Sequence, residues 1–119
     1  MAMIDDFPDD KNGDVLRWMR EYGDDLAMAR GIDFTVVFSS ESHAEQFRTV
    51  FSEKGYKTSI EKTDSDPEYP WDVVVVKHML PSHEDIGQFE SELQDIASRF
   101  DGFNGGWCCF VQKPSGTQI

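Results

Sequence analysis

The stretch from Tyr69 to Phe110 decides the fold. It reads Tyr69-Pro-Trp-Asp-Val-Val-Val-Val-Lys-His-Met-Leu-Pro81, continues as Ser82-His-Glu-Asp-Ile-Gly-Gln-Phe89, and closes on Asp101-Gly-Phe-Asn-Gly-Gly-Trp-Cys-Cys-Phe110. The four consecutive valines, residues 73–76, are apolar on both faces of a strand, which predicts that this strand lies in the middle of a sheet. Pro70 and Pro81 bracket the strand, because proline cannot donate a hydrogen bond to a strand ladder.

A helix is predicted to follow this strand directly. Ser82 is a suitable N-cap, and Asp85 places a carboxylate in the first turn, where the helix dipole favours negative charge. Apolar side chains then recur at helical spacing, at Ile86, Phe89, Leu93, Ile96 and Phe100. The glycines of residues 102–106 end the helix and turn the chain into a last strand that carries Trp107 and Phe110.

The first half of the chain repeats this strand–helix–strand pattern. Residues 32–39 alternate as a strand, Ser39 or Ser40 caps the next helix, and residues 56–62 alternate as an edge strand. The buried stripe of that helix is predicted at Ala44, Phe47, Val50 and Phe51. The element order is therefore β-α-β-β-α-β. It predicts an α+β fold of the ferredoxin-like, split β-α-β kind, in which a four-stranded antiparallel sheet carries two helices on one face.

An extra N-terminal helix is predicted in front of this plait. Asp14 can cap it, and one face is predicted to carry Val15, Trp18, Met19 and Tyr22. The plait leaves one sheet face without a helix, and exposed apolar surface usually has a partner. We expect the N-terminal helix to cover that face, since Trp18 and Tyr22 require burial. A homodimer formed through the sheet is the next alternative, and a ligand or partner on that face is the third.

The composition indicates one acidic domain. A chain of 119 residues with 39% hydrophobic residues can bury a core of its own. We predict an acidic flexible arm at residues 1–12, a single domain at 13–112 and a short tail at 113–119. The net charge of −12 opposes direct nucleic-acid binding and attachment to anionic membranes, and it favours a basic partner. No signal peptide or membrane-spanning run is visible, so we expect a cytoplasmic protein.

The sequence contains no recognisable catalytic, metal or cofactor motif. Cys108 and Cys109 are adjacent, lack the spacing of a zinc site and are interpreted as packing residues. The alternative is a site around His78, His83 and Glu84, because two histidines and a carboxylate form a common metal-ligand set. Asp72 is the candidate general base of that site. Packing and capping are the simpler roles for all of these residues.

Acidic residues cluster at the N-terminus, before the valine strand and along the last helix. An acidic helix face flanked by acidic loops suits an arginine-rich segment, because guanidinium groups pair with carboxylates in bidentate fashion. The alternative is an ordinary solvated face. On the first interpretation the predicted partner-binding residues are Asp64, Asp66, Glu68, Glu84, Asp85 and Glu92.

Several segments carry a family resemblance. They are Ala97-Ser-Arg-Phe-Asp101 with Gly102-Phe-Asn-Gly-Gly-Trp107, then Trp71-Asp72, His78-Met-Leu-Pro81 with His83-Glu84, and Ile32-Asp-Phe-Thr-Val-Val-Phe38. Together they make residues 13–112 resemble the regulator of ribonuclease E activity B (RraB-like) family, small acidic bacterial proteins that inhibit an endoribonuclease. The resemblance implies a non-enzymatic α/β plait without cofactor. It also implies binding to the basic, non-catalytic scaffold region of the endoribonuclease, which alters assembly of the RNA-degrading complex. The chain departs from the better-studied members in its tail, Val111-Gln-Lys-Pro-Ser-Gly-Thr-Gln-Ile119, which has no acidic residue.

Two functional hypotheses follow. In the first, a non-enzymatic acidic protein binds and inhibits an endoribonuclease through a basic segment of that enzyme, and its binding is sensitive to salt. In the second, a small enzyme or ligand-binding domain uses His78, His83 and Glu84, which then converge in a concave pocket with shifted pKa values. We adopt the first hypothesis as the prediction.

Overall fold

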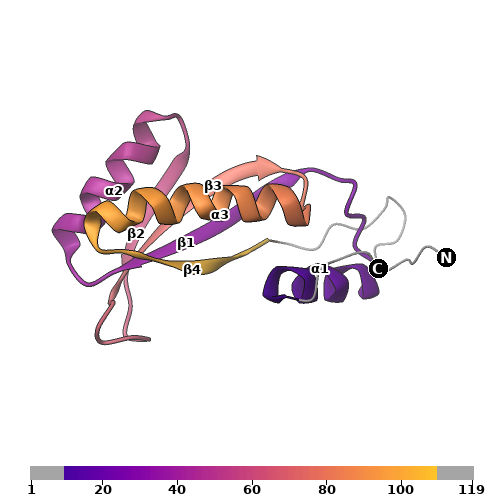
Figure 1. Ribbon diagram of the computed structural model, residues 1–119, viewed down its shortest axis with the longest axis horizontal. Coiled ribbons are helices and arrows are strands. Elements are labelled where there is room, and N and C mark those ends of the chain that lie inside the picture. The colour runs from indigo at the N-terminus through magenta and orange to yellow at the C-terminus, as the bar shows by residue number, and fades with distance from the viewer. Residues whose placement is uncertain (1–9, 110–119) are drawn as a thin grey trace.

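The computed structural model describes residues 10–109, which form three α-helices, one short 3-10 helix and a four-stranded sheet (Figure 1). In chain order the elements are α1 (Lys11–Glu21), β1 (Arg30–Phe38), α2 (Glu41–Glu53), β2 (Lys57–Lys62), β3 (Trp71–Met79), α3 (His83–Ala97), η1 (Ser98–Phe100) and β4 (Phe103–Cys108). Of the predictions for the ends of the chain, residues 1–9 of the N-terminal arm, Phe110 and the tail at 113–119 lie outside the described residues.

The sheet is open and antiparallel, with strand order β2-β3-β1-β4. The predicted interior position of the valine strand is confirmed, because β3 pairs with β1 on one side and β2 on the other. The two faces of that strand differ. Val73 and Val75 are fully buried on the helix side, whereas Val74 and Val76 point to the other face and are half-buried.

Helices α2 and α3 cover the same face of the sheet, and aromatic rings fill the space between. Phe89 of α3 lies with its ring centroid 4.8 Å from that of Phe34 and 6.2 Å from that of Phe51 of α2. Phe38 of β1 packs 5.1 Å from Phe47 of α2. Because the apolar stripes of both helices pack on the same face of the sheet, a single core forms.

The two predicted serine caps are present. The hydroxyl of Ser40 accepts a hydrogen bond from the backbone N–H of His43 at 3.3 Å, which selects Ser40 rather than Ser39. The hydroxyl of Ser82 accepts from the N–H of Asp85 at 3.1 Å. These caps set where α2 and α3 begin relative to the strands before them.

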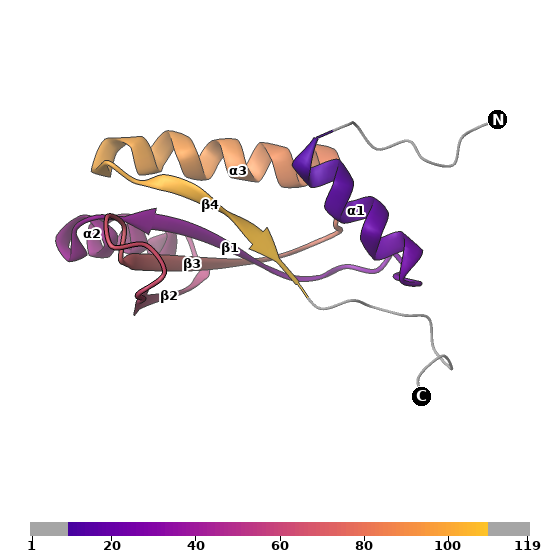
Figure 2. The same cartoon turned by 90° about the horizontal axis from the view of Figure 1, so that it is seen from below.

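The predicted N-terminal helix exists, but its start and its place were predicted wrongly, and of its predicted face only Met19 is buried. Asp10, not Asp14, caps α1, and its carboxylate accepts from Gly13 N–H at 2.8 Å. The helix buries Gly13, Leu16 and Met19, while the predicted anchors Val15, Trp18 and Tyr22 are 41%, 50% and 57% exposed. Figure 2 shows α1 at the end of the sheet, beside the start of α3. It does not cover the open face.

The open face of the sheet is therefore without cover from any described element. Strand register places Val37, Val74 and Val76 on it, together with Asp72 and the side chain of Phe103, which is 50% exposed. The cross-strand neighbours of these valines are polar, for example Asp33 beside Val76 and Thr35 beside Val74. The homodimer through the sheet stays a prediction.

Candidate functional site

The alternative site predicted around the histidines is not assembled. Strand register places His78 on the open face at the end of β3, whereas His83 lies in the first turn of α3 with its Nε2 2.9 Å from Asp10 Oδ2. Asp72 is six residues from His78 along β3, which corresponds to about 20 Å. Among residues 10–109 no group of three histidine, cysteine or acidic side chains is arranged to hold a metal ion. The two pockets described within residues 10–109 are lined by none of Asp72, His78, His83 and Glu84.

Asp72 has a perturbed environment for a structural reason. Burial, and then the charge of Glu61 on the neighbouring strand, raise the pKa of Asp72 above its ordinary value. A raised carboxyl pKa means that the folded protein disfavours the charged form. As pH rises from the ordinary value of 3.8 through the raised value, stability is lost, and the loss persists at neutral pH.

Asp72→Asn is therefore expected to increase the free energy of unfolding at about pH 7 and to leave it unchanged at about pH 3, where both states are protonated. Urea unfolding at the two pH values measures this. The control is Glu61→Gln, which removes the smaller of the two causes and should stabilise less. A gain of equal size at both pH values would contradict the electrostatic explanation.

The predicted partner-binding acids fall into two separate groups. Asp64, Asp66 and Glu68 lie in the loop before β3, whereas Glu84 and Asp85 begin α3, which follows β3. The nine residues of β3 hold these groups about 30 Å apart. Glu92 lies farther along α3, where it forms an exposed ion pair with Lys54 at 3.5 Å.

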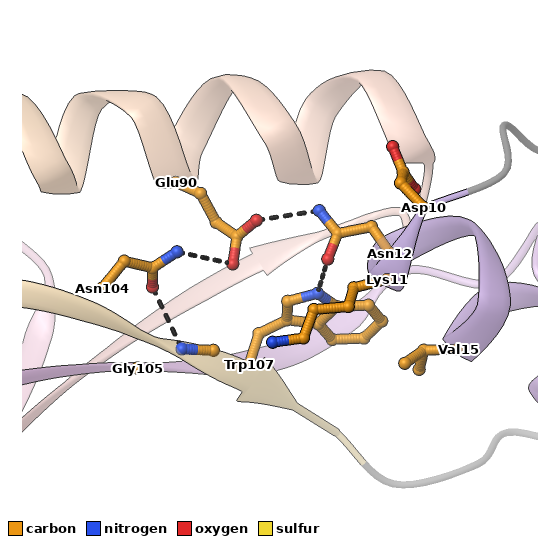
Figure 3. Close-up of a pocket in the computed structure, with 9 residues that line it drawn as sticks. Asp10, Lys11, Asn12, Val15, Glu90, Asn104, Gly105 and Trp107 are labelled. Carbon is orange, nitrogen blue, oxygen red and sulfur yellow. Dashed lines mark hydrogen bonds between the residues drawn. The ribbon is translucent and has the colours of Figure 1, made fainter.

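A pocket that the sequence did not predict lies where α1, α3 and β4 meet. Its volume is about 630 Å³. Figure 3 shows Glu90 reaching from α3 to a position between Asn104 of β4 and Asn12 of α1, with the indole of Trp107 below. We call this the Glu90 pocket; its further lining residues are Asp10, Lys11, Val15, Gly105 and Gly106.

Four hydrogen bonds in the Glu90 pocket form two chains, and each chain ends on one oxygen of the Glu90 carboxylate. The indole N–H of Trp107 donates to Asn12 Oδ1 at 2.8 Å, and Asn12 Nδ2 donates to Glu90 Oε1 at 2.8 Å. From the other side, Gly106 N–H donates to Asn104 Oδ1 at 3.1 Å, and Asn104 Nδ2 donates to Glu90 Oε2 at 3.0 Å. Because indole and backbone N–H groups can only donate, both amides must turn their NH₂ groups to residue 90. That position therefore requires an acceptor on both atoms.

The rim of the Glu90 pocket carries a second acid. Asp10 caps α1 and also contacts His83 Nε2 at 2.9 and 3.0 Å, so it links the starts of α1 and α3. The hydrogen bond from Gly13 N–H, and then that from His83, lower the pKa of Asp10 below its ordinary value. Asp10 is therefore negatively charged at neutral pH.

The outer edge of β4 beside the pocket is occupied by side chains. The backbone N–H of Asn104 donates to Gln94 Oε1 at 2.9 Å, and that of Gly106 donates to the side chain of Asn104. An edge strand with unpaired groups invites another strand, and these bonds remove two of its donors. The pocket thus presents side-chain chemistry rather than a free strand edge.

Several of these residues were visible in the sequence but were assigned other roles. Trp107, predicted on the last strand, is half-buried, packs against the core and lines the pocket. The glycines of residues 102–106 were predicted to turn the chain, but the positive φ in the turn before β4 is at Asp101, with φ 60°, whereas Gly106, with φ +108°, lies within β4. Cys108 was interpreted as a packing residue and is exposed, whereas Cys109 packs partly against the core, and its burial raises the pKa of its thiol. Nothing in the local sequence distinguishes Glu90 from the other acids of α3.

Comparison with known proteins gives one family. The family model described as "Regulator of ribonuclease activity B" matches residues 9–109. A search of curated proteins found no match. Within residues 10–109, none of the helices combines the length and the apolar character that a membrane span requires.

Proposed function

The chain belongs to the family of regulators of ribonuclease activity B, and from this we propose that it is a non-enzymatic acidic protein that binds a basic segment of an endoribonuclease and lowers its activity. The family match over residues 9–109 carries the proposal, since the family is described as regulators of ribonuclease activity. The net charge of −12 supports the basic, arginine-rich character of the partner. We place the protein in the bacterial cytoplasm with the RNA-degradation machinery.

The charge distribution of α3 favours it as a docking element. Helix α3 carries Glu84, Asp85 and Glu92, and it contains no lysine or arginine between His83 and Ala97. Acids exposed on one helix attract a basic peptide during encounter and help to set its register. The loop acids Asp64, Asp66 and Glu68 are about 30 Å from the start of α3, so one short segment does not reach both the loop and Glu84. We therefore propose α3 as the primary surface and the loop as a secondary one.

The second hypothesis, a small enzyme or ligand-binding domain, has less support. It requires His78 and His83 in one pocket, whereas His78 lies on the open face at the end of β3 and His83 contacts Asp10 from the first turn of α3. We also propose that the sheet is of the ferredoxin-like kind, because strand order β2-β3-β1-β4 with two helices on one face is that of a split β-α-β plait.

The proposal predicts salt-sensitive binding. Calorimetric titration with the arginine-rich scaffold segment of the host's endoribonuclease should give micromolar or tighter affinity that weakens at higher salt, because exposed charges are screened. Combining Glu84→Gln, Asp85→Asn and Glu92→Gln should weaken binding about tenfold, if each exposed pair contributes roughly 0.5 kcal/mol.

A matched triple variant provides the control. Asp64→Asn, Asp66→Asn and Glu68→Gln remove the same amount of charge at the other end of the sheet and should weaken binding much less. Equal losses in the two triple variants would indicate attraction by net charge alone, and α3 would then not be the docking surface. Absence of binding at both salt concentrations would contradict the proposed function itself.

A further inference from the structure

Glu90 carries a negative charge that has no ion-pair partner among residues 10–109. Its contacts are the amide groups of Asn12 and Asn104, at 2.8 and 3.0 Å, and its side chain is half-buried. Carboxylates that lose water usually gain a cation, because neutral donors compensate only part of the lost hydration. Here the two amides hold the carboxylate in one orientation while a pocket of about 630 Å³ stays open in front of it.

The geometry of this carboxylate suits a planar cation. Each carboxylate oxygen has about two acceptor positions, and one amide occupies one position on each oxygen. One acceptor position therefore remains on each oxygen, and a guanidinium group donates two parallel N–H bonds to the two oxygens of a carboxylate. An ammonium group is a point charge and cannot use both oxygens in this way.

The surroundings of the carboxylate add to this preference. The indole of Trp107 lines the same pocket, and guanidinium groups stack on aromatic faces. Asp10 adds a second negative charge at the rim. Lys11 is the one lysine or arginine among the lining residues that are described, and it reduces the attraction for a cation.

We propose that the Glu90 pocket binds an arginine side chain from a basic segment of a partner protein. The partner's identity rests on the proposed function, whereas the preference for guanidinium rests on Glu90 and Trp107 alone. The same hydrogen bonds also attach α1 to α3 and β4, so Asn12 and Asn104 are positioning residues. Their hydrogen bonds leave one acceptor position free on each oxygen of Glu90, and the arginine would occupy these two positions.

The test uses the full chain, labelled with ¹⁵N, and two synthetic peptides of equal length, oligoarginine and oligolysine. Oligoarginine is expected to shift the indole N–H resonance of Trp107, which Trp107→Phe identifies, and oligolysine is expected to bind more weakly and shift it less. Glu90→Gln should weaken oligoarginine binding about tenfold, because a charge-assisted bidentate pair is lost. Asp95→Asn, the matched control, changes an exposed acid of the same helix and should weaken binding less than about twofold.

Glutamine at residue 90 would turn an NH₂ group toward the NH₂ group of one of the two asparagines, which disturbs the packing of α1, α3 and β4. A second variant therefore leaves Glu90 in place. Lys11→Gln changes an exposed side chain outside the hydrogen-bond network and should tighten oligoarginine binding about two- to fivefold. Lys57→Gln removes an equal charge from β2 and should have a smaller effect.

Three results would overturn the inference: no binding of oligoarginine, binding without a shift of the Trp107 resonance, or equal affinities for the two peptides. The proposed function fails separately. If the ribonuclease segment binds and Glu90→Gln has no more effect than Asp95→Asn, the regulator stands and the arginine pocket does not. If oligoarginine binds in a Glu90-dependent manner and the ribonuclease segment does not bind, the pocket stands and the partner is wrong.

Discussion

Asp24→Ala is expected to lower the free energy of unfolding by about 3–5 kcal/mol, because it removes a buried carboxylate that pairs with the buried guanidinium of Arg30. Arg30 Nη1 lies 2.7 Å from Asp24 Oδ2, and Nη2 lies 2.9 Å from Oδ1, so the pair is bidentate. The two side chains are 3% and 0% exposed. Urea unfolding followed by circular dichroism measures the loss.

The matched control is Glu45→Ala, which breaks the exposed pair of Glu45 with Arg48 at 3.5 Å and should cost less than about 1 kcal/mol. The double variant Asp24→Leu with Arg30→Met should recover part of the stability, since an apolar pair of similar volume removes the burial cost of both charges but loses the hydrogen bonds from Arg30 to backbone carbonyls. If Asp24→Ala and Glu45→Ala cost the same, burial would not be the reason for the effect.

This pair matters for the site as well as for stability. Arg30 begins β1 and also donates to the backbone carbonyls of Asp25 and Met28, at 3.0 Å each through Nη2. The ion pair therefore organises the connection between α1 and β1. Since α1 supplies Asn12 to the Glu90 pocket, loss of this connection should also disturb the pocket.

Gly102→Ala is expected to destabilise the protein by about 1–3 kcal/mol through overpacking. A Cβ atom at residue 102 would lie 2.3 Å from Cε1 of Phe38. Phe38 is fully buried and packs against Phe47, so its ring has little room to move away. Gly102 follows η1 and begins the approach to β4, which places its backbone directly on the core.

The same substitution in α3 should have the opposite sign. Gly87→Ala would place a Cβ where, apart from the chain neighbours and the backbone of α3 itself, no atom lies within 4 Å, and alanine is preferred to glycine inside a helix by about 0.5–1 kcal/mol. Thermal or urea unfolding of the two variants gives the comparison. A Gly102→Ala protein as stable as Gly87→Ala would show that the ring of Phe38 can shift.

The proposed docking of a basic segment and the proposed arginine pocket use different acids of α3. Glu84, Asp85 and Glu92 are surface charges whose effect falls with salt, whereas Glu90 is half-buried and fixed by two amides. Salt should therefore weaken encounter more than it weakens the pocket contact. This difference allows the two contributions to be separated in one titration series.

Much of the architecture could be predicted from the sequence because its signals are local. The valine run, the serine caps of α2 and α3, and the apolar stripe of α3 are each read within about fifteen residues, and the structure contains all of them. Local periodicity was not sufficient for α1. Its sequence offers two overlapping stripes that share Met19, one with Trp18 and Tyr22 and one with Leu16. Only the neighbouring α3 and β4 select the second stripe.

Tertiary structure alone decided the site. The histidines predicted to converge are five residues apart, but His78 ends a strand on the open face and His83 begins a helix beside Asp10. Conversely, Asn12 is 78 residues from Glu90 and 95 from Trp107, yet all three share one hydrogen-bond network. Composition established that the chain is acidic, from which we predict a basic partner. Which carboxylate faces an open pocket depends on contacts between distant segments, and these form only when α1, α3 and β4 pack together.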